Sequence, residues 1–296
     1  MSQNISRRSV LGALLAAPVV ACAPRSSPAS ATDAPGLDAE LLALEHRFDA
    51  RLGLFARNAA TGRTLANRAD ERAAMCSTFK VYAVGALLRE RGLAGGHFER
   101  RITYGRGDLV EYSPITETRV DTGMTIGELC AAALQHSDNT AANLLLRELG
   151  GPRAIAPFAR SIGDDMTRLD RWETELNSAV PGDERDTTTP AAYASGLQRL
   201  LLGDVLAGPE RRRLTDWMLG NTTGDDRIRA GLPGDWRTAD KTGGGSYGVA
   251  NDVAVTWTSA GTPIVVALFT RRHREHDEHD DALLAEAARV VARRLA

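Results

Sequence analysis

The alternation of apolar and polar residues predicts strands near both ends of the chain and helices between them. Apolar residues recur at every third or fourth position over 37–52, which predicts a first helix. Residues 53–58 and 63–68 flank the turn-forming sequence 59–62, a pattern typical of a β-hairpin. A β segment therefore follows the first helix.

The middle of the chain has the spacing of amphipathic helices. This spacing predicts helices over 77–90, 126–135, 140–149, 190–202 and 209–219. Gly150-Gly151 and Gly220-Asn221 provide stops. The end of the chain returns to β-rich runs, at 252–259 and 263–270, and a helix over 281–295 closes it.

These segments group into two lobes. The two β-rich ends can form one sheet with helices packed on it, and the helical middle can form a second lobe. We expect an α/β lobe from 37–69 and 220–296 and a helical lobe from 70–219. Clefts between lobes are common ligand sites.

The N-terminus has the order of an export signal. Arg7-Arg8 stands before the apolar stretch 10–21, which is too short to span a bilayer as a permanent helix. The arginine pair resembles the signal of the twin-arginine export route. We therefore expect 1–21 to direct the protein out of the cytoplasm, to a secreted, periplasmic or lipid-anchored state.

Two processing sites compete after this signal. Val19-Val20-Ala21-Cys22 resembles a lipoprotein site, which would leave Cys22 acylated, whereas Ala29-Ser30-Ala31 is a rival cleavage site. Residues 22–36 are rich in Pro, Ser and Ala and are expected to form a flexible tether.

The informative feature of the composition is the small number of lysines. The net charge of −2 gives no indication of a nucleic-acid partner. Of the 36 lysine and arginine residues, only Lys80 and Lys241 are lysine. An arginine cannot be deprotonated in a protein, whereas a buried lysine can shift its pKa and act as a base. The two lysines therefore mark candidate chemistry.

Both lysines belong to short motifs, and a third motif lies between them. Ser77-x-x-Lys80 places two side chains on one helix face, where a neutral lysine can activate the serine. Ser137-Asp138-Asn139 precedes a predicted helix and is equally well explained as an N-cap. Lys241-Thr242-Gly243-Gly244-Gly245 comes just before a predicted strand, as a glycine-rich turn or as a strand edge open to a ligand.

Each motif is weak alone, but their order and spacing together resemble the class A serine β-lactamases. Segments 108–117, 136–146 and 181–190 are similar to family segments, and the resemblance runs from about Leu37 to the C-terminus. It implies an α/β (α+β) fold with an antiparallel sheet flanked by helices and an all-helical lobe. It also implies that Glu173 and Asn177 hold a water, a feature that penicillin-binding proteins lack.

The implied mechanism is acyl transfer to water. Ser77 attacks the β-lactam carbonyl, and either Lys80 or Glu173 takes its proton, since the acylation base is disputed for the family. Ser137 passes a proton to the lactam nitrogen, and Glu173 activates the water that releases the acyl group. The residues implied in substrate binding are Lys241, Thr242, Gly243, Gly244, Asn139, Asn177, Tyr112 and Arg227.

Some positions depart from the family pattern. Thr174 replaces a common proline, and Ala250 replaces a common arginine, for which Arg227 is either a substitute or an ordinary surface residue. Cys76 and Cys130 are expected to be buried free thiols, since the matching partner positions hold Gly245 and Val84. The histidines at 273, 276 and 279 indicate a solvated loop rather than a metal site.

Three functions remain open at this stage. A β-lactam hydrolase is favoured by Glu173 with Asn177, a peptidoglycan transpeptidase or peptidase is the second, and an acylated sensor without turnover is the third. We expect a monomer that needs neither metal nor cofactor and acts on a small molecule.

Overall fold

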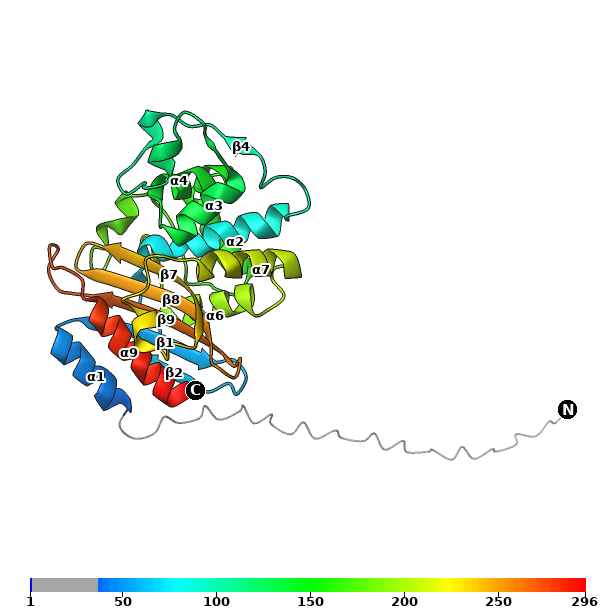
Figure 1. The fold of residues 1–296 in the computed structure, drawn as a ribbon. Helices are drawn as coiled ribbons and strands as arrows, with labels where there is room; N and C mark the ends of the chain where they lie inside the picture. Colours follow the sequence, from blue (N-terminus) through cyan, green and yellow to red (C-terminus); the bar gives the residue numbers. More distant parts are fainter. Residues whose placement is uncertain (2–36) are drawn as a thin grey trace. The chain divides into compact units, whose positions relative to one another are not determined.

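The computed structural model describes Met1 and residues 37–296, and the predicted export signal and tether lie outside these residues. Residues 37–296 belong to one compact unit. A five-stranded antiparallel sheet is flanked by helices, and further helices pack beside it (Figure 1). This confirms the expected fold class. The lobe boundaries, at 69/70 and 219/220, stay a prediction.

The sheet joins the two ends of the described chain. Its strands, in spatial order, are β2 (Thr64–Asn67), β1 (Arg51–Asn58), β9 (Pro263–Arg271), β8 (Val249–Trp257) and β7 (Arg237–Gly245). The first long strand therefore pairs with the last one, with Leu54 opposite Leu268. Strand β7 forms one edge, which leaves its outer side open to another element or to a ligand.

Both faces of the sheet are buried, because its strands are apolar at odd and at even positions. In β9, Ile264, Val266 and Leu268 pack with α1 (Leu37–Phe48) and α9 (Asp281–Leu295). The intervening residues Val265, Ala267 and Phe269 belong to the other core. Helix α6 (Pro190–Leu201) covers that second face. Helix α1 also packs on α9, so the ends of the compact unit meet (Figure 1).

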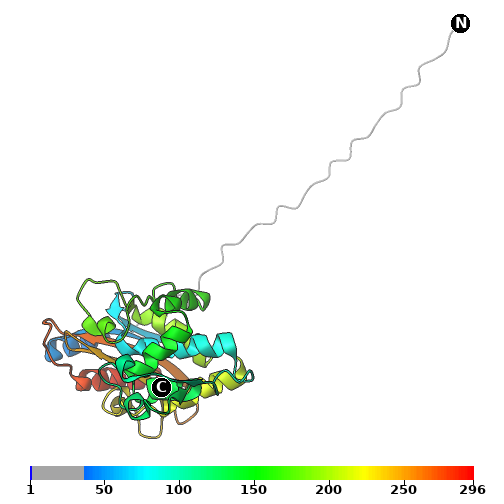
Figure 2. The ribbon, with the colours of Figure 1, turned by 90° about the horizontal axis from the view of Figure 1, so that it is seen from above.

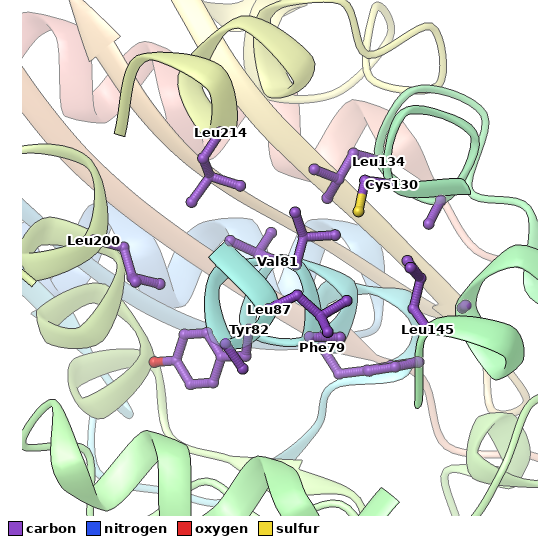
Figure 3. Close-up of a cluster of buried hydrophobic side chains, with 14 of the residues drawn as sticks. Phe79, Val81, Tyr82, Leu87, Cys130, Leu134, Leu145, Leu200 and Leu214 are labelled. Carbon is purple, nitrogen blue, oxygen red and sulfur yellow. The ribbon is translucent and has the colours of Figure 1, made fainter. Parts of the chain in front are cut away.

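A central helix, α2 (Lys80–Arg91), organises the helical part of the chain. It continues the 3₁₀ turn η1 (Cys76–Phe79), and its residues from Lys80 to Leu88 are all buried. Leucines of neighbouring helices surround it, among them Leu134, Leu145 and Leu214 (Figure 3). A helix enclosed on all sides needs no polar face, which explains its weak amphipathic pattern.

Helix α2 contacts α3 (Ile126–Gln135), α4 (Asn139–Glu148), α5 (Ile155–Ser161) and α7 (Gly208–Leu219), and the view from above shows these helices gathered around it (Figure 2). The short helix α8 (Ile228–Gly231) packs instead on α9, on the other face of the sheet. Among residues 37–296, no helix has the length and apolarity that crossing a membrane requires.

Two sequence predictions were wrong in detail. The first helix ends at Phe48 rather than at 52, because Arg51 already pairs with Arg271 in the sheet. The Lys241–Gly245 motif is the end of the edge strand β7, just before β8, so the strand-edge interpretation is confirmed and the glycine-rich turn is wrong. Strand β7 itself was not predicted, because its charged and glycine residues hide the alternation. The short pairings β3–β6 and β4–β5, and helix α5, were also not predicted.

Candidate active site

The site begins where η1 passes into α2. Ser77 lies in the 3₁₀ turn and Lys80 is the first residue of α2, so the two side chains are one turn apart. Lys80 Nζ donates a hydrogen bond to Ser77 Oγ over 2.8 Å. The Lys80 side chain is fully buried. This geometry brings an amine into direct contact with a hydroxyl that is a poor nucleophile until it loses its proton.

In the Ser137-Asp138-Asn139 segment, the middle residue caps a helix and the two outer residues contact Lys80. The Asp138 side chain caps α4 by accepting from the Ala141 N–H at 2.8 Å, as the capping interpretation predicts. Its neighbours face Lys80, whose Nζ lies 2.7 Å from the Ser137 carbonyl oxygen and from Asn139 Oδ1. Asn139 Nδ2 donates to a backbone carbonyl, so its amide is engaged at both ends.

Ser137 Oγ lies between two buried ammonium groups. Lys241 Nζ donates to it at 3.0 Å, and Lys80 Nζ donates to it at 3.3 Å. Lys241 reaches this point from the middle of β7, where it is fully buried. Thus the two lysines of the chain meet at one hydroxyl.

A buried carboxylate completes the cluster. Glu173 Oε1 lies 3.2 Å from Ser77 Oγ and 3.1 Å from Lys80 Nζ. Asn177 Nδ2 donates to Glu173 Oε2 at 2.6 Å. Among the described residues, Asn177 Oδ1 is buried without a hydrogen-bond partner, so an acceptor for a small polar molecule stays open beside the carboxylate. The Glu173–Thr174 peptide bond is cis.

Asn143 holds Glu173 in place and was not identified from the sequence. Its Nδ2 donates to the Glu173 carbonyl at 2.9 Å, and its Oδ1 accepts from the Glu173 N–H at 3.0 Å. The one available signal was an asparagine inside an apolar helical run, where a buried amide needs partners.

The segment that carries Glu173 is anchored by a second buried carboxylate. Asp186 is fully buried and accepts from Arg171 Nε at 2.6 Å. It also accepts from the backbone N–H groups of Asp170 and Arg171, at 2.7 and 3.0 Å. The resemblance implies an ion pair between Arg171 and Asp186 that closes this loop, and the structure has this pair, with its carboxylate inside the protein.

Burial shifts the pKa of both lysines in the same direction. It lowers the pKa of Lys80, and the nearby Glu173 carboxylate opposes that shift. Burial also lowers the pKa of Lys241, to well below its ordinary value, and the charge of Lys80 adds to the shift. Removing an ammonium from water disfavours its charged form, so both groups release a proton more readily than a solvated lysine.

An open cavity of about 410 Å³ lies above this cluster. Its lining includes Ser77, Ser137, Thr242, Gly243 and Gly244. A neighbouring hollow of about 500 Å³ extends it past Asn177 and Gly245. A cavity of this size is typical of a small-molecule site.

Tyr112 and Arg227, two of the residues implied in substrate binding, also line the cavity. Tyr112 is 58% exposed and stands at the rim. Arg227 is buried, so it is not a surface arginine. Its Nη1 donates to the carbonyls of Gly243 and Asn251 at 2.8 Å, and its Nε to Asp281 at 2.9 Å.

The cysteines match the sequence prediction. Cys76 and Cys130 are free and buried. A Cβ placed at Gly245 would lie 2.8 Å from Cys76 Sγ, so these positions face each other. In the described part of the chain, no group of three or more His, Cys, Asp or Glu side chains is arranged to hold a metal ion.

Comparisons with known proteins identify the family of the whole chain. A profile described as "Beta-lactamase enzyme family" matches residues 36–295. The chain is 58% identical over 253 residues to the β-lactamase FAR-1 of Nocardia farcinica, covering 86% of this chain and 81% of that protein. It is 50% identical to a carbapenem-hydrolysing β-lactamase, KPC, of Klebsiella oxytoca, covering 88% and 90%.

Solved structures with a similar fold are also β-lactamases. A β-lactamase from Desulfarculus baarsii superimposes with a TM-score of 0.86 at 54% identity, covering 88% of this chain and 98% of the other. A reconstructed last common ancestor of Gram-negative class A β-lactamases gives a TM-score of 0.83, also at 54% identity, covering 86% and 98%.

Proposed function

This chain belongs to the class A β-lactamases, and from that premise we propose that Ser77, Lys80, Ser137 and Glu173 are its catalytic residues. The enzyme hydrolyses the β-lactam amide bond through a serine acyl-enzyme and thereby gives antibiotic resistance. The observation that carries the residue assignment is the position of Ser77 Oγ. It lies within hydrogen-bond distance of both Lys80 Nζ and Glu173 Oε1.

In acylation, Ser77 Oγ bonds to the β-lactam carbonyl carbon and the carbon–nitrogen bond breaks. The serine proton goes to Lys80, or to Glu173 through a water, and Ser137 delivers a proton to the departing nitrogen. The backbone N–H groups of Ser77 and Gly244 stabilise the oxyanion. The placement of Ser137 Oγ between two ammonium groups supports its role as the proton carrier.

Substrate binding falls to the residues around the cavity. Lys241, Thr242 and Arg227 bind the substrate carboxylate, with Gly243 shaping the strand edge. Asn139 faces the substrate's amide side chain, and Tyr112 forms the wall of the cleft. Support comes from the cavity lining, which contains Thr242, Arg227, Gly243, Asn139 and Tyr112.

In deacylation, Glu173 takes a proton from water while the water oxygen attacks the ester carbonyl, and Ser77 is released. Asn177 supports this role because its Oδ1 is an open buried acceptor next to the carboxylate. A transpeptidase or an acylated sensor has no use for this pair, so the geometry favours hydrolysis.

A chromogenic cephalosporin tests the residue assignment. The protein should turn over many equivalents, whereas Glu173→Ala should release one equivalent and accumulate an acyl adduct that mass spectrometry detects. The control is Glu175→Ala, which removes an exposed carboxylate two residues away and should retain turnover. A Glu173→Ala protein that turns over normally, with no adduct, would refute the assignment of the deacylation base.

Members of this family act on small β-lactams and are generally exported. We propose that Arg7-Arg8 directs this chain to the twin-arginine route and that it acts as a monomer. Lipidation at Cys22 and cleavage after Ala31 give different mature N-termini. Mass spectrometry of the exported protein distinguishes a diacylated Cys22 from a chain that begins at Thr32.

A further inference from the structure

A second cavity, of about 290 Å³, lies apart from the candidate active site and shares none of the residues that line it. One wall consists of the ends of β1 and β9, at Arg51 and Arg271, and another of residues 179–184. The segment 68–74 closes a third side. The cavity thus separates the sheet from the back of the loop that carries Glu173.

Arginines line both the sheet side of this cavity and the side closed by residues 68–74. Arg51, Arg68, Arg72 and Arg271 line it. Arg51 and Arg271 are direct partners in the β1–β9 register, and both lie on the face that carries Phe269. Like charges at facing positions of an antiparallel pair destabilise it. The fold therefore keeps a repulsive pair at the mouth of a cavity.

Most charges around the cavity are already paired, but Arg271 is not. Arg68 binds Glu45 through two bonds of 2.7 and 2.9 Å, and Arg51 contacts Glu71. Asp183 is held by Arg185 at 2.7 Å. Across residues 37–296, Arg271 makes no ion pair, and its side chain donates only to the Arg272 carbonyl, at 3.3 Å.

Arg271 is also half-buried. Burial and the facing Arg51 lower the pKa of its guanidinium, although an arginine stays charged at any physiological pH. The nearby Glu71 carboxylate opposes that shift, but it is already bound by Arg51 and Arg68. A charge that is partly removed from water and has no ion pair of its own is costly unless a ligand provides one. The charge, the cavity and the repulsive pair together indicate a site that is built for an anion.

We propose that this cavity binds a small phosphate-type oxyanion, held by Arg271 with Arg51 and Arg72 beside it. A planar guanidinium donates two parallel bonds to such an oxyanion, which a lysine does not. Arg72 is rigidly oriented, since its Nη1 donates to the Met166 carbonyl and to Thr187 Oγ1, both at 2.9 Å. A volume near the lower limit of ligand pockets suits phosphate, pyrophosphate or a small phosphate ester.

The site is independent of the assigned hydrolytic activity. Its occupant would contact residues 179–184 from behind, whereas the substrate cavity lies at Ser77 on the other side of the loop. A bound anion would neutralise the repulsion between Arg51 and Arg271. It would therefore stabilise the folded protein, by an amount that grows with the logarithm of its concentration over its Kd.

Titration calorimetry with inorganic pyrophosphate at constant ionic strength tests the proposal. The protein should show one saturable site, and Arg271→Gln should weaken its Kd about ten-fold or more. The matched control is Arg57→Gln, which removes the same charge from the same face of β1, about 20 Å along the strand. That variant should bind like the unmodified protein.

A melting experiment provides a second readout. Because Arg271→Gln removes a repulsion, its melting temperature without ligand should equal or exceed that of the unmodified protein, but pyrophosphate should no longer raise it. If this variant does not fold, Arg51→Gln makes the same test from the facing strand. Three results would each refute the proposed site. They are the absence of saturable pyrophosphate binding, an equal loss of pyrophosphate affinity in Arg57→Gln, and full competition between pyrophosphate and a β-lactam.

Discussion

At Ser137 the two lysines of the chain contact one hydroxyl, yet they are not equivalent. Lys80 contacts the Ser77 oxygen and a carboxylate, so it sits where a proton must leave a nucleophile. Lys241 contacts Ser137 and a backbone carbonyl, and no carboxylate pairs with it among the described residues. Lys80 therefore suits proton transfer, and Lys241 suits charge recognition.

Lys80→Arg tests the first role. An arginine keeps the charge but cannot give up a proton, so kcat/KM should fall by a factor of about 10² or more. The control is Arg91→Lys, an exposed exchange at the other end of α2, which should leave the rate unchanged. Near-normal turnover by a folded Lys80→Arg protein would remove lysine from the proton path.

Lys241→Arg tests the second role through pH. Because burial lowers the pKa of Lys241 well below 10.5, its charge is present below that folded pKa and is lost as the pH rises through it. The kcat/KM profile should therefore fall on its alkaline side below pH 10.5. Arginine stays charged, so Lys241→Arg should move this limb to higher pH. An unmoved limb would assign the titration to another group.

At the level of elements, the loop from Arg171 to Asp186 depends on one buried carboxylate. Asp186→Asn leaves the shape but removes the charge that Arg171 pairs with, and breaking a buried pair costs about 3–5 kcal/mol. We expect a lower melting temperature and a deacylation rate that falls more than the acylation rate. Glu184→Gln, an exposed change in the same loop, should alter neither. Stopped-flow kinetics that show equal loss in both steps would contradict this expectation.

The sequence predicted elements well where one local pattern determines them. Helices α3 and α9 begin and end where the apolar spacing indicates, because their amphipathic faces are local properties. Strand β7 was not predicted, because its own residues favour a turn and only pairing with its sheet partner, β8, stabilises it as a strand. The burial of Arg227 was equally hidden, since it depends on carbonyls of two different strands.

For the whole molecule, the site is assembled from distant parts of the chain. Ser77, Ser137, Glu173 and Lys241 come from four segments that meet only when the sheet and the helices have packed. The motifs identified these residues because their chemistry is local. Their mutual distances were not predictable, because pairing between β1 and β9 leaves no signal in either strand alone.

The packing of α1 on α9 implies that the connectivity of this protein can be rearranged. Arg293 in α9 contacts Glu40 in α1, so a flexible linker of about six residues should join residue 296 to residue 37. New ends opened between Gly95 and Gly96, an exposed turn after α2, break no strand or helix. Such a circular permutant should retain β-lactam turnover, whereas one opened between Val265 and Val266 in β9 should not fold.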